Sequence, residues 1–211
     1  MSSMIFPIFS KPIYRQRLRV SGAKLKPVLN FLHENDFPNL EFSTKVNIGK
    51  NLHRVLHDER FKFLADAILK EFYLFANNEL KYTCDWQLTS SWFVKLNPMD
   101  EGNFHTHDNS FFSGVYYLDT PQDCGNITFA NFNNRRLALE HSEYNLLNAR
   151  KWTVQAEAEN VLFFPSDVYH RVEKNMSGAT RYSLAFNIMP LGRIQEVDMS
   201  DSIINLGEMY E

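Results

Sequence analysis

The stretch Asn103–Leu118, NFHTHDNSFFSGVYYL, carries the strongest pattern in the sequence. It places His105 and His107 one residue apart, directly before a run of β-branched and aromatic residues. Residues two apart in an extended chain point to the same face of a strand, so both imidazoles can face one point. The stretch therefore predicts a strand that begins with two potential metal ligands.

Two later positions extend this pattern. His170 follows the apolar run VLFFP at residues 161–165, and Arg181 opens a further run, RYSLAFNIM. Paired histidines, a distant histidine and then a basic residue, each on its own strand, are typical of a mononuclear iron site in a small jelly roll. A guanidinium at the start of an apolar strand needs an anionic partner, and its planar fork matches a carboxylate such as that of 2-oxoglutarate.

The ligand set has three alternatives. Iron(II) in oxygenases takes two imidazoles and usually one carboxylate, which an H-x-D or H-x-E pair supplies from one strand. Here the second position is occupied by His107, which favours His105, His107 and His170 because that set needs no distortion. A bulge could instead turn Asp108 inward in place of His107. In the third alternative His105 and His170 bind the ion alone, and water completes the set.

Composition limits the class of protein. The chain has 211 residues and a formal charge of −3, so one domain is expected and nucleic-acid binding is not. Its 18 phenylalanines suit a sheet-rich core. Cys84 and Cys124 form no C-x-x-C pair and are expected to be free thiols in a reducing compartment. No signal peptide or membrane-spanning stretch is recognisable, which predicts a soluble, cytoplasmic protein.

Periodicity divides the single expected domain, residues 1–211, into three parts. Residues 1–81 are expected to form an N-terminal arm with an edge strand, followed by helices over 24–35 and 59–80. Residues 82–190 read as short strands with frequent turns, and residues 191–211 as a loosely held tail. The predicted class is α+β, mainly β: a double-stranded β-helix, or jelly roll, with the helices packed on one sheet.

Two further segments contain weaker patterns. His53 and His57 lie four apart, but the pair lacks an H-E-x-x-H pattern and a nearby third ligand, so it is interpreted as a solvated helix start. Residues 131–151 form a polar insertion of the kind that serves as a lid or binding loop.

The chain resembles a family of 2-oxoglutarate- and iron(II)-dependent oxygenases. The resemblance rests on H-x-H-x-x-S at 105–110, S-G-V-Y-Y-L at 113–118, F-F-P-S-x-x-x-H at 163–170 and R-x-S-x-x-F-N at 181–187. It implies iron(II) and 2-oxoglutarate as cofactors, with ascorbate as an accessory reductant. Prolyl hydroxylases have a similar Y-Y-L strand whose tyrosine touches 2-oxoglutarate, which points to Tyr117. Aspartyl hydroxylases similarly lack the usual carboxylate two residues after the first histidine.

The function expected from this resemblance is a dioxygenase that hydroxylates a substrate with release of succinate and carbon dioxide. Its partners would be the small-molecule co-substrate and a substrate whose class the sequence leaves open. Two alternatives are a cupin-like metal-binding isomerase and a non-enzymatic jelly-roll binding protein. Neither would consume 2-oxoglutarate, and the isomerase would not need Arg181.

Overall fold

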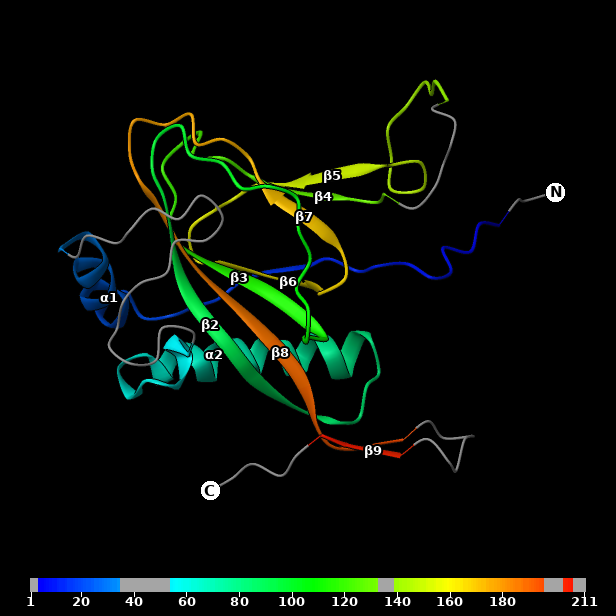
Figure 1. Ribbon diagram of the computed structural model, residues 1–211, viewed down its shortest axis with the longest axis horizontal. Helices are drawn as coiled ribbons and strands as arrows, with labels where there is room; N and C mark the ends of the chain where they lie inside the picture. The colour runs from blue at the N-terminus through cyan, green and yellow to red at the C-terminus, as the bar shows by residue number, and fades with distance from the viewer. Residues whose placement is uncertain (1–3, 35–53, 133–138, 196–202, 207–211) are drawn as a thin grey trace.

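The computed structural model describes residues 4–34, 54–132, 139–195 and 203–206, which form two antiparallel sheets with helices on one side (Figure 1). The large sheet has the order β1-β6-β3-β8-β2, with β9 paired to β8, and the small sheet has the order β5-β4-β7. The large sheet consists of β1 (Tyr14–Arg17), β2 (Asp85–Leu96), β3 (Phe112–Asp119), β6 (Asn160–Pro165), β8 (Arg181–Gln195) and β9 (Ile203–Leu206). The small sheet consists of β4 (Ile127–Ala130), β5 (Lys151–Val154) and β7 (Tyr169–Val172).

The helices cover one face of the large sheet. They are α1 (Gly22–Glu34), the short turns η1 (Val55–His57) and η2 (Glu59–Phe61), α2 (Lys62–Tyr73) and the π-helix η3 (Leu74–Glu79). Figure 1 shows α2 running across β2, β3 and β8, on the side away from the small sheet. The predicted layers are therefore present, with helices on one face and a second sheet on the other.

Alternation along the strands of the large sheet creates two cores. On β6, Val161 and Phe163 belong to the core under the helices, whereas Leu162 and Phe164 belong to the core between the sheets. Side chains of successive strand residues point to opposite faces, so one strand serves both cores. The same rule divides the two adjacent tyrosines of β3: Tyr116 packs under the helices and Tyr117 between the sheets.

The helix-side core is built around Phe72 of α2. Its ring centroid lies 5.1 Å from that of Trp86, 5.3 Å from that of Phe112 and 5.1 Å from that of Phe163, all with edge-on geometry. Edge-to-face contacts of this kind add stability beyond that of apolar burial. Phe72 thus packs α2 against three strands of the large sheet.

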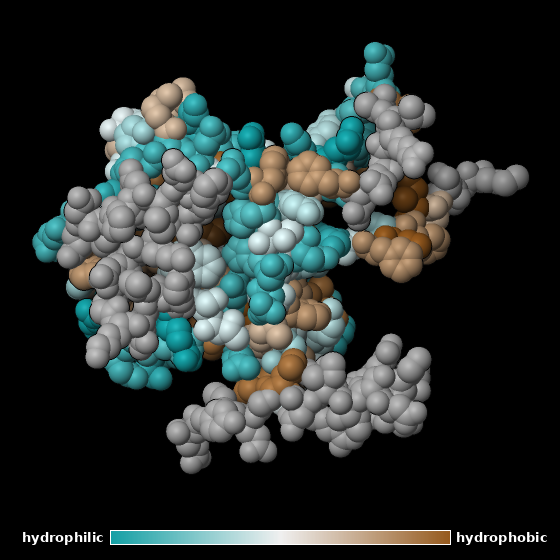
Figure 2. All heavy atoms as spheres, viewed as in Figure 1, coloured by the Kyte–Doolittle hydropathy of each residue, from teal (hydrophilic) through white to brown (hydrophobic). Residues whose placement is uncertain are grey.

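The helix and edge-strand predictions for the N-terminal part are confirmed. α1 falls on the predicted helix at 24–35, and η2, α2 and η3 together span the one predicted at 59–80. β1 lies at an edge of the large sheet. Ahead of it, Met4–Phe9 form an apolar arm whose large side chains are at least 68% exposed; brown side chains gather at this end in Figure 2.

The prediction of a loose tail from residue 191 is wrong for the described part of that segment. β8 continues to Gln195 and pairs with β9 in the register Gly192↔Leu206. Pro190 stays in register opposite Trp86 of β2, and Gly192 takes a positive φ of 87°. The strand bends at this point and continues.

No helix in the described ranges is both long enough and apolar enough to cross a membrane. The insertion at 131–151 connects β4 to β5, and its residues 133–138 lie outside the described part.

Candidate active site

Backbone pairing brings the three histidines together. The amide of His105 donates to the carbonyl of His170 at 3.0 Å, and the amide of His170 donates back to the carbonyl of His105 at 3.0 Å. The amide of His107 donates to the carbonyl of Ser166 at 3.0 Å. The segment before β3 therefore lies beside β7, and residues about 60 apart along the chain meet at the edge of the small sheet.

Their side chains form a compact cluster. The candidate ligand nitrogens of His105, His107 and His170 all lie within 4.8 Å of one another. Their ring centroids are 4.4 Å apart for His105 and His170, 5.1 Å for His107 and His170, and 5.3 Å for His105 and His107. The spread in exposure, from exposed His105 to buried His170, leaves one side of the cluster open to ligands.

Each imidazole has an oxygen atom next to its Nδ1. His105 Nδ1 lies 2.9 Å from the carbonyl of Asn103, and His170 Nδ1 lies 3.0 Å from the carbonyl of Val168. His107 Nδ1 lies 2.7 Å from Oδ1 of Asn187. Because these oxygens accept hydrogen bonds, each Nδ1 carries the proton, and each Nε2 keeps a lone pair free for a metal.

Burial favours the neutral form of His107 and His170, which metal binding requires. Burial lowers the pKa of His170 to about 3, and the neighbouring His105 contributes in the same direction. Burial also lowers the pKa of His107, against the opposing effect of its hydrogen bond to Asn187. At neutral pH a metal ion therefore displaces no proton from His170 or His107.

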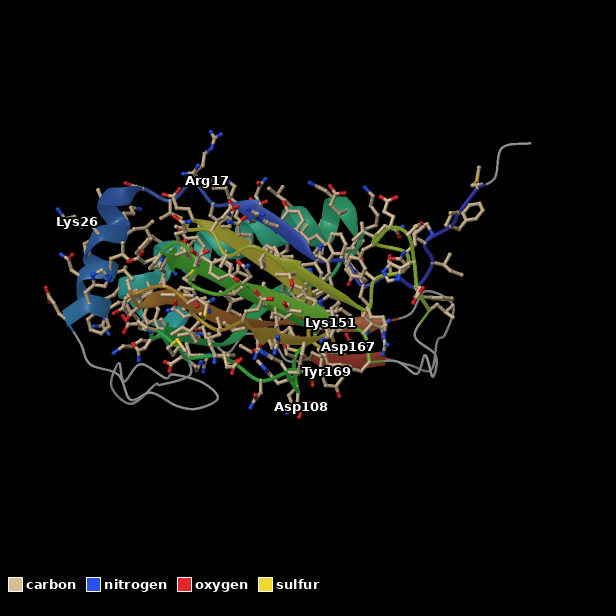
Figure 3. The ribbon with its side chains drawn as sticks, turned by 90° about the horizontal axis from the view of Figure 1, so that it is seen from above. Arg17, Lys26, Asp108, Lys151, Asp167 and Tyr169 are labelled. Atoms are coloured by element: carbon tan, nitrogen blue, oxygen red, sulfur yellow. The ribbon has the colours of Figure 1, made fainter. Side chains whose placement is uncertain are left out.

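Asp108 is placed differently from the histidines. It lies in a turn, is exposed, and is not part of the cluster of ligand atoms. Figure 3 shows it at the outer edge of the molecule. The turn continues into Asn109, which has a φ of 53°. The chain thus leaves the histidine strand without the inward bulge that a carboxylate ligand would need.

Arg181 begins β8 opposite Leu96 and is only 2% exposed. Its Nη1 donates to the carbonyl of Gly125 at 2.9 Å, whereas its Nε has no hydrogen-bond partner among the described residues. No ion pair formed by the described residues includes it. Burial lowers the pKa of the guanidinium, and a buried cation without a carboxylate is costly unless a ligand supplies one.

Tyr117 lies beside this arginine. The guanidinium carbon of Arg181 is 5.6 Å from the centre of the Tyr117 ring, within the range of a cation–π contact. Burial raises the pKa of Tyr117 to about 12, even though Arg181 acts in the opposite direction. Its hydroxyl therefore stays protonated at neutral pH and can donate to an anion.

One cavity of about 380 Å³ joins these groups. Its polar lining consists of the three histidines, Tyr117, Arg181 and Ser183. Its apolar lining includes Val115, Ile127 and Phe164. The cavity is also lined by Trp92, Met99, Asp100 and Glu101. An apolar wall with a few convergent polar groups is the usual form of a small-molecule site. The sequence predicted this meeting of residues 105, 107, 170, 117 and 181, and the structure brings them into one cavity.

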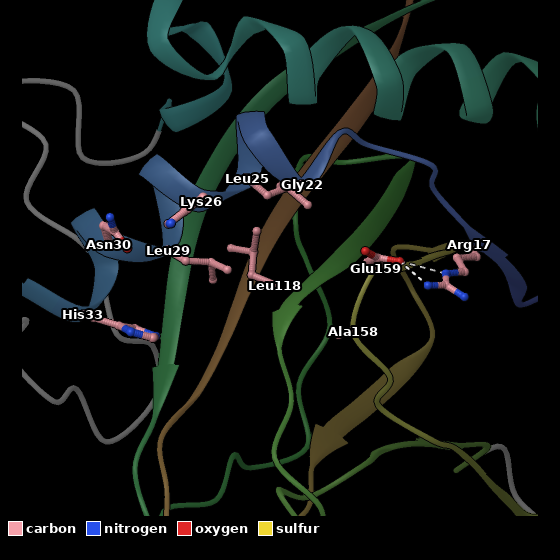
Figure 4. A pocket seen from close by; sticks show the side chains of 10 residues that line it. All are labelled: Arg17, Gly22, Leu25, Lys26, Leu29, Asn30, His33, Leu118, Ala158 and Glu159. Carbon is pink, nitrogen blue, oxygen red and sulfur yellow. Dashed lines mark hydrogen bonds and ion pairs between the residues drawn. The ribbon is translucent and has the colours of Figure 1, made fainter.

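A second hollow, of about 530 Å³, lies between α1 and the end of β3 and contains none of these residues (Figure 4). Its basic side chains are partly engaged, because Arg17 pairs with Glu159 and His33 lies 3.4 Å from Asp119. Of the histidine pair near α2, His57 does not belong to the histidine cluster found among the described residues, and His53 lies outside those residues.

A family described as "Putative 2OG-Fe(II) oxygenase" matches residues 90–187, which include every residue of the cavity named above. The matched region of 98 residues is just under half of the chain and resembles this oxygenase family. No curated protein is similar enough in sequence to be matched with it.

Several solved structures of enzymes share its fold. The non-heme alpha ketoglutarate dependent carbocyclase SnoK from nogalamycin biosynthesis is 14% identical, with a TM-score of 0.60 over 85% of this chain and 79% of that one. A Pseudomonas putida prolyl-4-hydroxylase is 16% identical, with a TM-score of 0.52 over 84% and 85%. HygX from Streptomyces hygroscopicus, with nickel and 2-oxoglutarate bound, is 11% identical, with a TM-score of 0.58 over 85% and 83%. The two sheets of this chain are thus those of a double-stranded β-helix.

Proposed function

We propose that this oxygenase hydroxylates a C–H bond of its substrate. In that reaction one atom of dioxygen enters the substrate and the other enters succinate, while the first carbon of 2-oxoglutarate leaves as carbon dioxide. One observation supports the proposal most strongly: Arg181 is buried with no carboxylate partner among the described residues, and it shares a cavity with three imidazoles whose Nε2 atoms make no hydrogen bond to those residues. An anion site beside a cation site suits a dicarboxylate that also binds a metal.

His105, His107 and His170 are the proposed iron ligands. The donor set fits iron(II), because imidazole is an accepted ligand for this ion and three ligands on one side leave positions open. When bound, iron supplies the oxidation of the C–H bond with dioxygen and 2-oxoglutarate. The three side chains hold the ion at the edge of the small sheet, where His170 is the most deeply buried.

Arg181 and Tyr117 are the proposed co-substrate residues. A carboxylate of 2-oxoglutarate would neutralise the guanidinium and accept a hydrogen bond from Nε, the atom that lacks a partner among the described residues. The Tyr117 hydroxyl, kept protonated by burial, would be a second donor. Val115, Ile127 and Phe164 line the same cavity and exclude water from the reacting groups.

The fold alone does not select the reaction, so hydroxylation is stated as a proposal. The similar structures include a carbocyclase and an epimerase as well as prolyl hydroxylases. The two free cysteines, Cys84 and Cys124, support the further proposal that the protein acts in the reducing cytoplasm.

The test is formation of succinate from 2-oxoglutarate with iron(II), ascorbate and dioxygen, before any substrate is known. Wild type is expected to form succinate slowly. His105→Ala and His170→Ala should lose that turnover because they cannot hold the metal. Arg181→Ala should raise the concentration of 2-oxoglutarate needed for half-maximal rate by about 100-fold or more, the effect of removing a charged partner from a buried pair.

A wild-type protein that forms no succinate, or a His170→Ala variant that keeps its full rate, would contradict the oxygenase assignment of these residues. A metal-binding isomerase would bind iron yet leave 2-oxoglutarate unchanged. A jelly-roll binding protein would show no tight binding of iron or manganese.

A further inference from the structure

Asn187 lies at the centre of a polar network behind the histidine cluster. It is on β8, in register with Ser113 of β3 and Ser90 of β2. Its Oδ1 is 2.7 Å from His107 Nδ1 and accepts a hydrogen bond from Ser113 Oγ at 2.9 Å. Its Nδ2 donates to Ser90 Oγ at 2.9 Å. Every polar atom of the amide is therefore engaged, and contacts from two neighbouring strands fix its orientation.

The network extends beyond the amide through serine hydroxyls. Ser113 Oγ lies 2.8 Å from Ser166 Oγ, and Ser166 Oγ lies 2.9 Å from Ser110 Oγ. Ser110 Oγ in turn donates to the carbonyl of Phe112 at 2.7 Å. Ser113 and Ser166 are at most 1% exposed, so their hydroxyls find their hydrogen-bond partners inside this network. The chain of hydroxyls stabilises the amide that faces His107.

His107 differs from the other two histidines in what holds it. The Nδ1 atoms of His105 and His170 are matched by backbone carbonyls two residues earlier, which no substitution can remove. The hydrogen-bond partner of His107 Nδ1 is instead a side chain, that of Asn187 on β8. Its tautomer and ring orientation therefore depend on the identity of residue 187.

We propose that Asn187 is a positioning residue that holds His107 with its proton on Nδ1. This tautomer leaves Nε2 of His107 free to be the third metal ligand, at the position where an H-x-D or H-x-E pair would supply a carboxylate. The inference rests on the proposed function, in which the three histidines bind the metal. An imidazole with its proton on Nε2 would present an N–H group to the ion and could not bind it.

Two nearly isosteric variants separate the acceptor from the rest of the amide. Asn187→Leu removes the acceptor, and Asn187→Asp keeps it but loses the donor to Ser90. Ser90→Ala is the matched control, because it also breaks a hydrogen bond of Asn187 without touching His107. Two quantities are measured: the imidazole ¹⁵N shifts of the metal-free protein, which show which nitrogen is protonated, and the Kd for cobalt(II) by calorimetry.

Asn187→Leu is expected to move the His107 proton to Nε2 in part of the molecules and to raise the Kd by about 10- to 100-fold, as loss of a ligand-orienting partner does in metal sites. Asn187→Asp should keep the proton on Nδ1 and bind cobalt at least as tightly as wild type. Ser90→Ala should change the Kd by less than about threefold.

An Asn187→Leu variant with an unchanged His107 tautomer and Kd would overturn the proposal. If that variant does not fold, the aspartate variant decides, because a Kd more than tenfold above wild type in spite of its stronger acceptor also overturns it. His105→Ala and His170→Ala test the proposed function separately. If both bind cobalt as wild type does, the metal assignment itself fails, whatever the Asn187 variants show.

Discussion

At the scale of single residues, the geometry separates His107 from its neighbour Asp108. His107 contacts both other histidines and has its Nδ1 matched inside the molecule, whereas Asp108 is exposed in the following turn. Side chains on opposite faces of one short segment cannot share a role at one ion, so substitution of each should have very different effects.

We predict that His107→Ala raises the Kd for cobalt(II) by about 100-fold or more, beyond the cost of losing a residue that only orients a ligand. Asp108→Ala should stay within about threefold of wild type, because its carboxylate lies outside the cluster. Titration of both variants by calorimetry at one pH measures this. A larger loss for Asp108→Ala than for His107→Ala would mean that the turn rearranges when metal binds.

The residues that meet in the cavity could be predicted better than those that support them. Strand order and the i, i+2 rule were enough to select His105, His107, His170 and Arg181, because each lies in an extended run with its own signature. The role of Asn187 could not be chosen in advance. It depends on which residues of β2 and β3 lie opposite it, and register between distant strands is not visible in spacing along the chain.

At the scale of elements, α2 joins the helical layer to the sheet through Phe72. This side chain is fully buried and its ring meets aromatic rings from β2, β3 and β6. The next turn carries Leu74, an apolar residue that is 45% exposed. The two positions are a matched pair, because both are large apolar residues of one continuous helical segment.

We predict that Phe72→Ala lowers the free energy of unfolding by about 3–5 kcal/mol, because it leaves a cavity among three rings. Leu74→Ala should change it by less than about 1 kcal/mol. Urea denaturation followed by far-UV circular dichroism measures both values. Similar losses for the two variants would show that α2 is not anchored through the face described.

Helices and most strands followed from periodicity, but the end of β8 did not. Pro190 and Gly192 are ordinary breakers, and the sequence alone predicted a tail after them. In the structure an antiparallel partner, β9, pairs with the continuation of β8, and the flexible φ of glycine accommodates the bend. Tertiary pairing overrode local propensity at this point.

At the scale of the whole molecule, buried tyrosines make stability depend on alkaline pH. Burial raises the pKa of Tyr117 to about 12, against an ordinary value of 10.0. The folded protein therefore holds this proton more tightly than the unfolded chain does. The resulting stability is complete below pH 10 and is lost as pH rises from 10 through 12, where only the unfolded chain is free to ionise.

We predict that the free energy of unfolding falls between pH 9 and pH 11.5, with Tyr117 contributing up to about 2 kcal/mol of the decrease. Tyr117→Phe cannot ionise and should show a smaller decrease over the same range. Urea denaturation of both proteins at several pH values measures the difference. Parallel curves for the two would show that Tyr117 ionises as easily in the folded state as in the unfolded one.

The buried charge of Arg181 has a consequence for the life of the protein in the cell. Burial disfavours the charged guanidinium, and the carboxylate proposed to bind there would offset that cost. A bound dicarboxylate would shift the folding equilibrium toward the folded state by mass action. Because proteases remove unfolded chains continuously, the abundance of the protein should rise and fall with the supply of its own co-substrate.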